Sequence, residues 1–255
     1  MIRLEHVDFA YREDPVLQDV TFTVGPGETK VILGSSGSGK STILKVILGL
    51  AKPQAGRVFV NGMELTSAGE RELLKVRKKI GMVFQGGALF DSMTVGENIG
   101  YYLLEHTDKP PAEVERAALD ILNYLGLSDS LLDVLPDELS GGMQRRVAIG
   151  RAVAAENPKI MLYDEPTTGL DPISTTTIID LIKKLQREKG VSSVVVTHQI
   201  TDAFDISDQF IVLHRGRIVF DGDAHGLLNC TAEYVAEFLR PYLQSVRALP
   251  MQGVT

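Results

Sequence analysis

A glycine- and serine-rich stretch, residues 34–41, constrains the fold of this chain more than any other segment. It reads GSSGSGKS and so has the form G-x-x-x-x-G-K-[ST]. The short branched run Val31-Ile32-Leu33 before it is typical of a buried strand. The apolar residues after it, from Thr42 to Leu48, have helical spacing. Strand, glycine-rich loop and helix together predict a phosphate-binding loop.

The chemistry of such a loop follows from its residue types. Glycines allow successive backbone N–H groups to point at one anion, and a helix N-terminus adds its own unpaired N–H groups. From this stretch Lys40 can reach the β- and γ-phosphates of a nucleotide, and the Ser41 hydroxyl can bind Mg²⁺. The segment therefore predicts a nucleoside triphosphate with Mg²⁺ as the bound ligand.

Length and composition exclude several other classes of protein. The chain has 255 residues, 44% of them hydrophobic, as expected for an ordinary globular protein of one large domain or two lobes. Its net charge of −7 argues against nucleic acid as the main partner. No apolar run is long enough to span a bilayer, and we expect no signal peptide. The single cysteine, Cys230, excludes an internal disulfide and is typical of a reducing compartment.

The rest of the chain predicts an α/β core with two additions. Residues 2–9 and 16–24 alternate as half-exposed antiparallel strands do, and 58–60 is a further short strand. A charged helical stretch is expected from about Ser67 to Lys79. Residues 86–156 contain helical but no strand patterns, which indicates a helical subdomain inserted into the core. We therefore expect the core to comprise residues 1–85 and 157–228, and a C-terminal tail to comprise residues 229–255.

Several polar residues follow apolar strands of this core. Gln85 ends the run from Ile80, and Asp164 and Glu165 end the run from Pro158. An aspartate at a strand end is the expected magnesium-side group of a P-loop NTPase, and Glu165 beside it is a candidate general base. His198 also follows a buried strand, at the sheet edge where ligands bind in α/β folds.

A second anion-binding turn occurs far from the first. Ser140-Gly141-Gly142 stands at the start of a helical pattern and could bind phosphate as the first loop does. One phosphate group rarely needs two such turns from one chain.

These motifs, in this order, resemble those of the ATP-binding cassette (ABC) ATPases over residues 1 to about 225. Tyr11 matches the aromatic residue that stacks on adenine, and residues 34–41 match Walker A. Residues 139–144 match the signature motif, with Met143, Arg145 and Arg146 at positions where many members have other residues. The resemblance assigns nucleotide binding to Tyr11, Gly34, Ser35, Ser36, Gly37, Ser38, Gly39, Lys40, Ser41, Thr42, Gln85, Ser140, Gly141, Gly142, Gln144 and Asp171.

The resemblance also implies a fold and a mechanism. The fold is that of a P-loop NTPase with a RecA-like parallel sheet, an antiparallel β subdomain and an inserted helical subdomain. Two copies pair head to tail, so that the signature turn of one faces ATP on the Walker A loop of the other. Ser41, Gln85 and Asp164 serve Mg²⁺. The catalytic residues are Glu165, which polarises water, His198 and Lys40.

Within this family, residues 76–95 resemble the ATPases of phospholipid transporters of the Mla and Mce type. That implies a peripheral subunit on the cytoplasmic face of the inner membrane. It also implies a separate transmembrane permease, an MCE-domain lipid-binding subunit, and a tail that could embrace a neighbouring cassette. The alternative is the ATPase of an importer for polar amino acids or other small solutes, which share much of the pattern. A soluble ABC protein of translation or DNA repair usually has two cassettes or a coiled-coil insert, and neither is found here.

Overall fold

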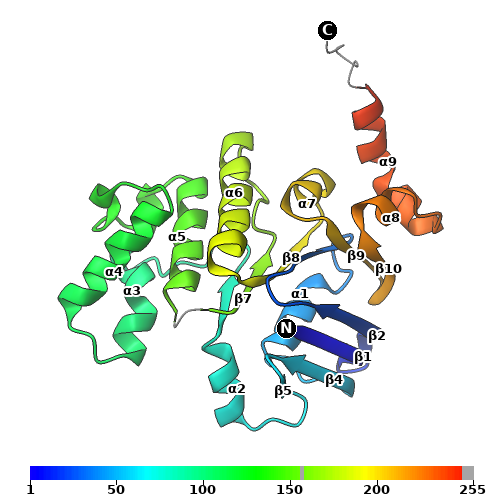
Figure 1. The fold of residues 1–255 in the computed structure, drawn as a ribbon, viewed down its shortest axis with the longest axis horizontal. Helices are drawn as coiled ribbons and strands as arrows, with labels where there is room; N and C mark the ends of the chain where they lie inside the picture. The colour runs from blue at the N-terminus through cyan, green and yellow to red at the C-terminus, as the bar shows by residue number, and fades with distance from the viewer. Residues whose placement is uncertain (156–157, 249–255) are drawn as a thin grey trace.

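The centre of the molecule is a six-stranded sheet (Figure 1). The computed structural model describes residues 1–155 and 158–248, with side chains to residue 245. The strand order is β10-β9-β3-β8-β7-β6, and neighbours are parallel except for the β9–β10 hairpin. The strands are β3 (Thr29–Leu33), β6 (Ile80–Val83), β7 (Ile160–Asp164), β8 (Ser192–Thr197), β9 (Gln209–His214) and β10 (Arg217–Asp223).

Every residue of β3 and β8 is buried because both faces of the sheet are covered, which explains their unbroken apolar runs. One face packs on helices that include α5, α6 and α7. The other face packs on α1 and on a second, antiparallel sheet of order β2-β1-β4-β5. The strands of that sheet are β1 (Ile2–Tyr11), β2 (Asp14–Val24), β4 (Ala55–Val60) and β5 (Met63–Glu64). The alternation predicted for β2 is present, since Val20, Phe22 and Val24 are buried and Thr21 and Thr23 are exposed.

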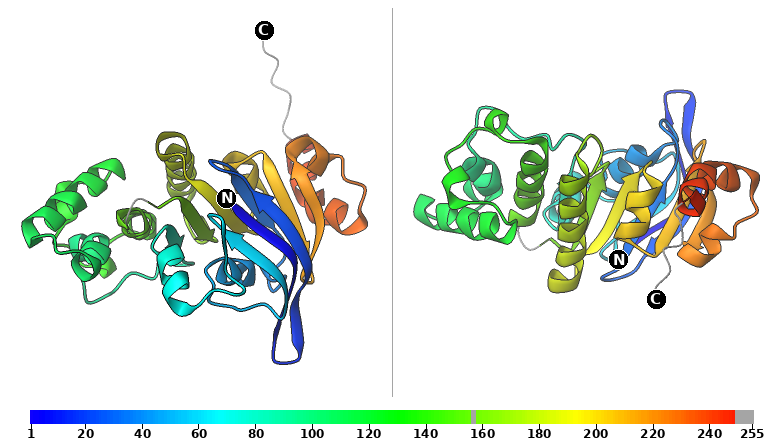
Figure 2. Two further views of the ribbon diagram at one scale, coloured as in Figure 1. Left: turned by 60° about the horizontal axis from the view of Figure 1, so that its bottom comes forward. Right: turned by 90° about the horizontal axis from the view of Figure 1, so that it is seen from above.

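Residues between β6 and β7 form a helical lobe at one end of the molecule (Figure 2). Thr94 and Glu97 form a capping box at the start of its first helix, and Gly126, at φ 67°, follows the end of its second. The lobe comprises α3 (Val95–His106), α4 (Pro111–Tyr124), the short 3₁₀ turns η1 (Asp129–Leu131) and η2 (Pro136–Glu138), and α5 (Gly141–Ala154). The predicted boundary between residues 156 and 157 lies outside the described residues.

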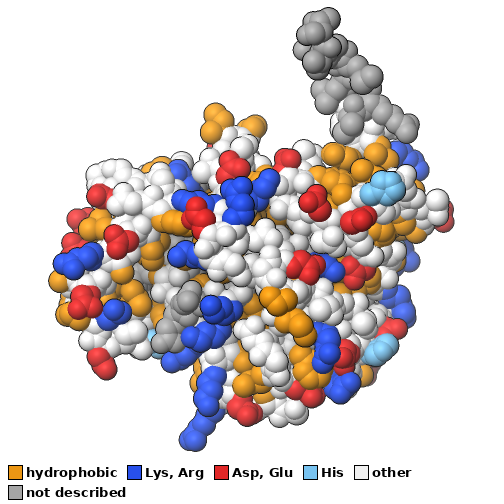
Figure 3. Space-filling model, viewed as in Figure 1, with side chains coloured by type: hydrophobic (Ala, Val, Ile, Leu, Met, Phe, Trp, Pro, Cys, Tyr) orange, Lys and Arg blue, Asp and Glu red, His pale blue; other side chains and the backbone are white. Residues whose placement is uncertain are grey.

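The remaining helices are α1 (Lys40–Ile47), α2 (Glu70–Arg77), α6 (Pro172–Lys189), α7 (Ile200–Ile206), α8 (Ala224–Leu228) and α9 (Glu233–Ala248). Among the described residues, no helix is both long and apolar enough to cross a membrane. Figure 3 shows Lys and Arg side chains gathered over α2 and the segment after it. Arg77 in that cluster is structural, since its guanidinium donates to the carbonyls of Leu48 and Gly49 and pairs with Glu70.

Strands β1, β2 and β4 are longer than predicted, and three further boundaries differ from the structure. The strand expected to end at Gln85 ends at Val83, and the loop after it is held by a side chain from α5 that bonds the carbonyl of Phe84. The strand expected to include Glu165 ends at Asp164, because Glu165 adopts a left-handed backbone with φ 48°. The helix expected from Ser67 begins at Glu70, because Gly69 is its N-cap in an extended conformation.

Candidate functional site

The loop of residues 34–41 joins β3 to α1 and curls around the side chain of Lys40. Gly39 has φ 107°, and a Cβ there would lie 2.9 Å from Leu17 Cδ2, so only glycine fits this position. Lys40 is the first residue of α1 and is buried. Its Nζ donates back across the loop to the carbonyl oxygens of Gly34 (2.8 Å) and Ser35 (3.0 Å). The amine is thus fixed at the centre of the loop.

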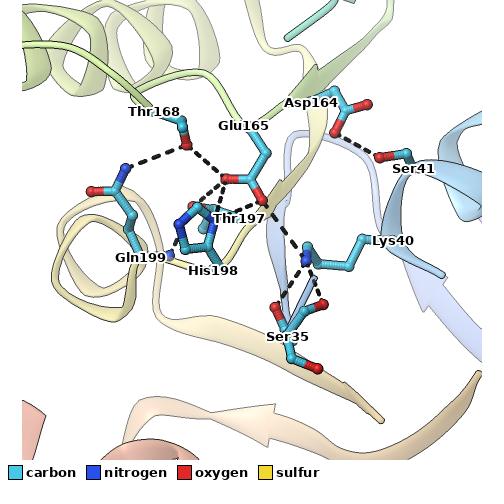
Figure 4. A network of polar contacts seen from close by, with 10 residues as sticks. Ser35, Lys40, Ser41, Asp164, Glu165, Thr168, Thr197, His198 and Gln199 are labelled. Atoms are coloured by element: carbon cyan, nitrogen blue, oxygen red, sulfur yellow. Dashed lines mark hydrogen bonds and ion pairs between the residues drawn. The ribbon is translucent and has the colours of Figure 1, made fainter. Parts of the chain in front are cut away.

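Two carboxylates face this amine from the end of β7 (Figure 4). Lys40 Nζ lies 3.8 Å from Glu165 Oε1. Burial lowers the pKa of Lys40, while the negative charges of Glu165 and Asp164 act in the opposite direction without restoring the ordinary value. The loop therefore holds an amine whose charged form would be stabilised by an additional anion.

Ser41 and Asp164 form an oxygen pair at the mouth of the loop. The Ser41 hydroxyl donates to Asp164 Oδ1 at 3.0 Å. Burial raises the pKa of Asp164, and the hydrogen bond from Ser41 opposes that shift. A hydroxyl and a carboxylate beside a phosphate loop suit Mg²⁺, which prefers oxygen ligands and usually keeps several waters and substrate phosphates. No group of three or more His, Cys, Asp or Glu side chains able to hold a metal occurs in the described ranges, so the protein would supply only part of such a shell.

Glu165 occupies a strained and well-bonded position. Its φ of 48° lies in the left-handed region that non-glycine residues rarely adopt, and its N–H donates to the carbonyl of Val196 (2.9 Å). Its carboxylate accepts hydrogen bonds from Thr168 Oγ1 (2.9 Å) and Thr197 Oγ1 (3.2 Å) and lies 3.0 Å from His198 Nδ1. The backbone turns the side chain off the strand, and these neighbours hold it over Lys40.

The pKa of Glu165 is below its ordinary value. Burial acts to raise that pKa, but the hydrogen bonds from His198 and Thr168, with the charges of His198 and Lys40, outweigh burial. The carboxylate therefore stays ionised at neutral pH and can accept a proton.

These groups surround one cleft of about 740 Å³. It is lined by Val16, Ser35, Ser36, Gly37, Gly39, Lys40, Ser41, Thr42, Gln85, Glu165, His198 and Phe238. The polar members come from the phosphate loop and from the ends of strands far apart in sequence. The cleft thus gathers the phosphate loop, Gln85, Glu165 and His198 in one place.

Other predicted nucleotide-binding residues do not line this cleft. Tyr11 is 48% exposed and makes an edge contact with Phe9, with ring centroids 4.8 Å apart. Ser140 caps α5 by accepting the N–H of Met143 (3.3 Å). Gln144 Nε2 donates to the carbonyl of Pro136 (2.7 Å).

Gly142 and Asp171 both adjoin Ser174, in the first turn of α6. A Cβ on Gly142 would collide with the Ser174 side chain, so the absence of a side chain allows α5 and α6 to approach here. Asp171 caps α6 by accepting the N–H groups of Ile173 and Ser174, both at 3.0 Å. The second glycine turn and Asp171 are therefore packed together, apart from the phosphate loop of their own chain.

The arginines of α5 connect the helical lobe to the loop that carries Gln85. Arg145 is buried, and its Nη1 donates to the carbonyl of Phe84 (2.9 Å). Arg151 donates to the carbonyls of Ala88 (2.8 Å) and Gly87 (3.1 Å). Hydrogen bonds from α5 therefore hold the backbone on both sides of Gln85.

Sequence reasoning missed four groups of the site. Thr168 and Thr197 adjoin Glu165 and His198 in the sequence, and their position beside a candidate base was the available signal. Val16 and Phe238 line the cleft from a predicted strand and from the predicted tail, neither of which carries a nucleotide-binding motif there. No local sequence signal could have placed Phe238 there.

The comparisons with known proteins agree with this geometry. The family model described as "ABC transporter" matches residues 17–168, more than half of the chain. The intermembrane phospholipid transport system ATP-binding protein MlaF of Haemophilus influenzae is 34% identical over 94% of this chain and 90% of its own length. The methionine import ATP-binding protein MetN of Carboxydothermus hydrogenoformans is 39% identical over 87% of this chain. The matched region covers 66% of the length of that relative.

The fold is also that of a solved cassette. A dimeric, post-hydrolysis structure of the ATP-binding cassette MJ0796 bound to ADP and Pi has a TM-score of 0.80 and 36% identity, covering 88% of this chain and 98% of that one. Cassettes of this family bind ATP with Mg²⁺ and hydrolyse ATP. With its phosphate loop, its Ser41–Asp164 oxygen pair and this match, the chain belongs to the ATP-binding cassette ATPases of ABC transporters.

Proposed function

We propose that this chain hydrolyses ATP in the cleft around Lys40 and thereby powers an ABC transporter. The observation that carries the proposal is the convergence of three groups in one cleft: the phosphate loop, the Ser41–Asp164 oxygen pair, and an ionised Glu165. Lys40 and the loop N–H groups bind the phosphates and stabilise the charge that develops on the transferred phosphoryl group. Ser41 and Asp164, with Gln85 nearby, would hold Mg²⁺, which would neutralise phosphate charge when bound.

In this mechanism Glu165 accepts a proton from the attacking water. Its low pKa keeps it ionised, and Thr168, Thr197 and His198 fix the direction of its carboxylate. His198 lies on the γ-phosphate side, within reach of both the base and the substrate. Bound triphosphate would place negative charge beside the buried Lys40 amine and so stabilise its charged form.

Thr168→Val tests how the base is positioned. Burial raises and Thr168 lowers the pKa of Glu165, so loss of the hydroxyl should raise that pKa. Because the ionised base is active, the acid limb of the kcat–pH profile should move to higher pH. At neutral pH, where Glu165 stays ionised, the lost hydrogen bond leaves its carboxylate less well oriented, so we expect kcat to fall about tenfold with KM changed less than about twofold. Thr168→Ser keeps the hydroxyl and should restore the wild-type profile. An unshifted profile in Thr168→Val would contradict this role.

We further propose that a second copy completes the site. The glycine turn at Ser140 and Asp171 lie outside the cleft of their own chain, while the related cassette MJ0796 is dimeric. In a head-to-tail pair, the N-terminus of α5, with Ser140, Gly141 and Gly142, would face the γ-phosphate bound to the other copy. In this proposal residues 1–85 and 157–228 act as the ATP-binding body, 86–156 as the signature lobe and 229–255 as a tail.

For the transported molecule we propose phospholipid, with a separate transmembrane permease and an MCE-domain subunit as partners. The match to MlaF supports this, because it extends over 94% of this chain and 90% of MlaF. The chain would then act peripherally at the cytoplasmic face of the inner membrane. The second candidate is import of methionine or another small solute, favoured by the higher identity to MetN, 39% over 225 residues.

A capture experiment separates these two substrates. The tagged full chain, as Glu165→Gln with Mg-ATP, is used to purify its complex from detergent-solubilised membranes of its native host, with Lys40→Met as the control. A permease with an MCE-domain protein and enriched phospholipid supports lipid transport. A permease with a solute-binding protein and no enriched lipid supports small-solute import. Recovery of no membrane protein would contradict both.

A further inference from the structure

The C-terminal helix α9 reaches the nucleotide cleft through one aromatic side chain. Phe238 is half-buried and lines the cleft together with residues 35–37 of the phosphate loop and Val16. Val16 and Phe238 are the two apolar side chains in that lining, whose other side chains are polar or charged. A nucleotide has a charged end and a flat, largely apolar end, so these two residues mark the part of the wall suited to the base and sugar.

Helix α9 is fixed in this position by its own packing. Val235 and Leu239 are buried in the core, on the side of α9 that faces the sheet. One turn before Phe238, the ring of Tyr234 stacks on His214 at the end of β9, with ring centroids 3.6 Å apart. One turn after Phe238, Tyr242 stacks on Phe204 of α7, with centroids 5.0 Å apart. Phe238 is thus held between two anchored aromatic residues of the same helix.

The anchor of α9 is directly connected to the phosphate loop. The chain turns after His214, and the N–H of Gly216 donates to the carbonyl of Ser38 at 3.0 Å. A side chain on Gly34 would also meet the Leu213 carbonyl, so β9 lies directly against the start of the loop. Helix α9, the end of β9 and the phosphate loop therefore form one packed unit.

We propose that Phe238 is a nucleotide-contacting residue and that α9 forms one wall of the ATP site. This inference rests on the proposed nucleotide cleft and adds to it a contact from the C-terminal segment. The flat ring offers an apolar and polarisable surface on which a base or sugar can pack, beyond the hydrogen bonds that the loop supplies. Nucleotide affinity should then depend on the docking of α9, although α9 lies about two hundred residues after the phosphate loop in the sequence.

Affinity for Mg-ADP, which is not hydrolysed, provides the first test. We expect Phe238→Ala and Phe238→Leu to weaken Mg-ADP binding about tenfold by calorimetry, and Phe238→Tyr to bind like wild type. Glu237→Ala is the matched control, since it truncates an exposed side chain of the same helix outside the cleft and leaves the aromatic anchors of α9 in place, and it should bind within about twofold of wild type. Thermal melting of each variant tests whether the fold is intact. Phe238→Leu is included because leucine keeps an apolar side chain at this position of α9.

A direct contact can be observed by fluorescence because the chain contains no tryptophan. Phe238→Trp introduces a single reporter in the cleft, and Tyr242→Trp introduces one a turn away. Mg-ADP should change the emission of the first at the concentration that fills the site and leave the second nearly unchanged. Unchanged emission of Phe238→Trp at saturation, with wild-type affinity in Phe238→Ala and Phe238→Leu, would overturn the proposal. If wild type itself bound no Mg-ADP, the proposed nucleotide-binding function would be wrong as well. If wild type bound Mg-ADP normally, a negative result at Phe238 would contradict only the role of Phe238.

Discussion

Glu165→Gln should lower the rate of ATP hydrolysis about a thousandfold while Mg-ATP affinity stays within about threefold of wild type. The substitution keeps the size of the side chain and its contacts with Thr168 and Thr197, but the amide cannot accept a proton from water at neutral pH. We expect the left-handed backbone at residue 165 to persist, because glutamine adopts this conformation no less readily than glutamate does. Phosphate release in steady state measures the rate, and equilibrium binding measures the affinity.

A carboxylate outside the site serves as the control for that variant. Glu105 on α3 is exposed, and Glu105→Gln should hydrolyse ATP like wild type. If Glu165→Gln retained near wild-type hydrolysis, another group would have to act as the base, and the assignment of Glu165 would be wrong.

Lys40→Met should reduce Mg-ATP affinity at least about a hundredfold and remove measurable hydrolysis at ordinary ATP concentrations. The amine is the buried cation at the centre of the loop, bonded to the carbonyls of Gly34 and Ser35. Its charge-assisted hydrogen bonds to phosphate have no substitute in methionine. Titration of the variant with Mg-ATP by calorimetry gives the affinity directly.

The pKa of Lys40 also predicts that this variant folds. Burial lowers that pKa, so the folded chain without nucleotide favours the charged amine less than the unfolded chain does. Removing the charge should therefore leave the melting temperature unchanged or raise it. Lys45 on the same helix is exposed, and Lys45→Met is the matched control, expected to bind Mg-ATP like wild type. A Lys40→Met variant that bound Mg-ATP normally would show that the nucleotide lies elsewhere.

The sequence predicted the local parts of this site well because each part is encoded by neighbouring residues. The phosphate loop needs glycines at fixed offsets, and the strands before Asp164 and His198 are unbroken apolar runs. The carboxyl ends of parallel strands meet at one sheet edge, so Glu165 and His198 could be expected near each other. Their hydrogen-bonded contact at 3.0 Å and the turn of the backbone at Glu165 depend on tertiary packing and were not predictable.

Residues that act at a distance were harder to place. The order of the motifs along the chain does not say how far apart they lie in space. It therefore does not by itself reveal that Ser140 and Asp171 lie outside the cleft. For α9, the spacing of Tyr234, Val235, Phe238 and Leu239 indicated an apolar face without saying what it covers. The structure packs that face on the chain's own core, and the part of the predicted tail from residue 249 lies outside the described residues.

The central claim is that ATP binds at the Lys40 loop and is enclosed by the signature turn of a second copy. Sedimentation velocity of Glu165→Gln with Mg-ATP, with Mg-ADP and without nucleotide tests it most directly. We expect a dimer with Mg-ATP, monomer in the other two conditions, and monomer throughout when Lys40→Met is added. A chain that stayed monomeric with Mg-ATP bound, while wild type hydrolysed ATP at a rate per chain independent of protein concentration, would contradict it.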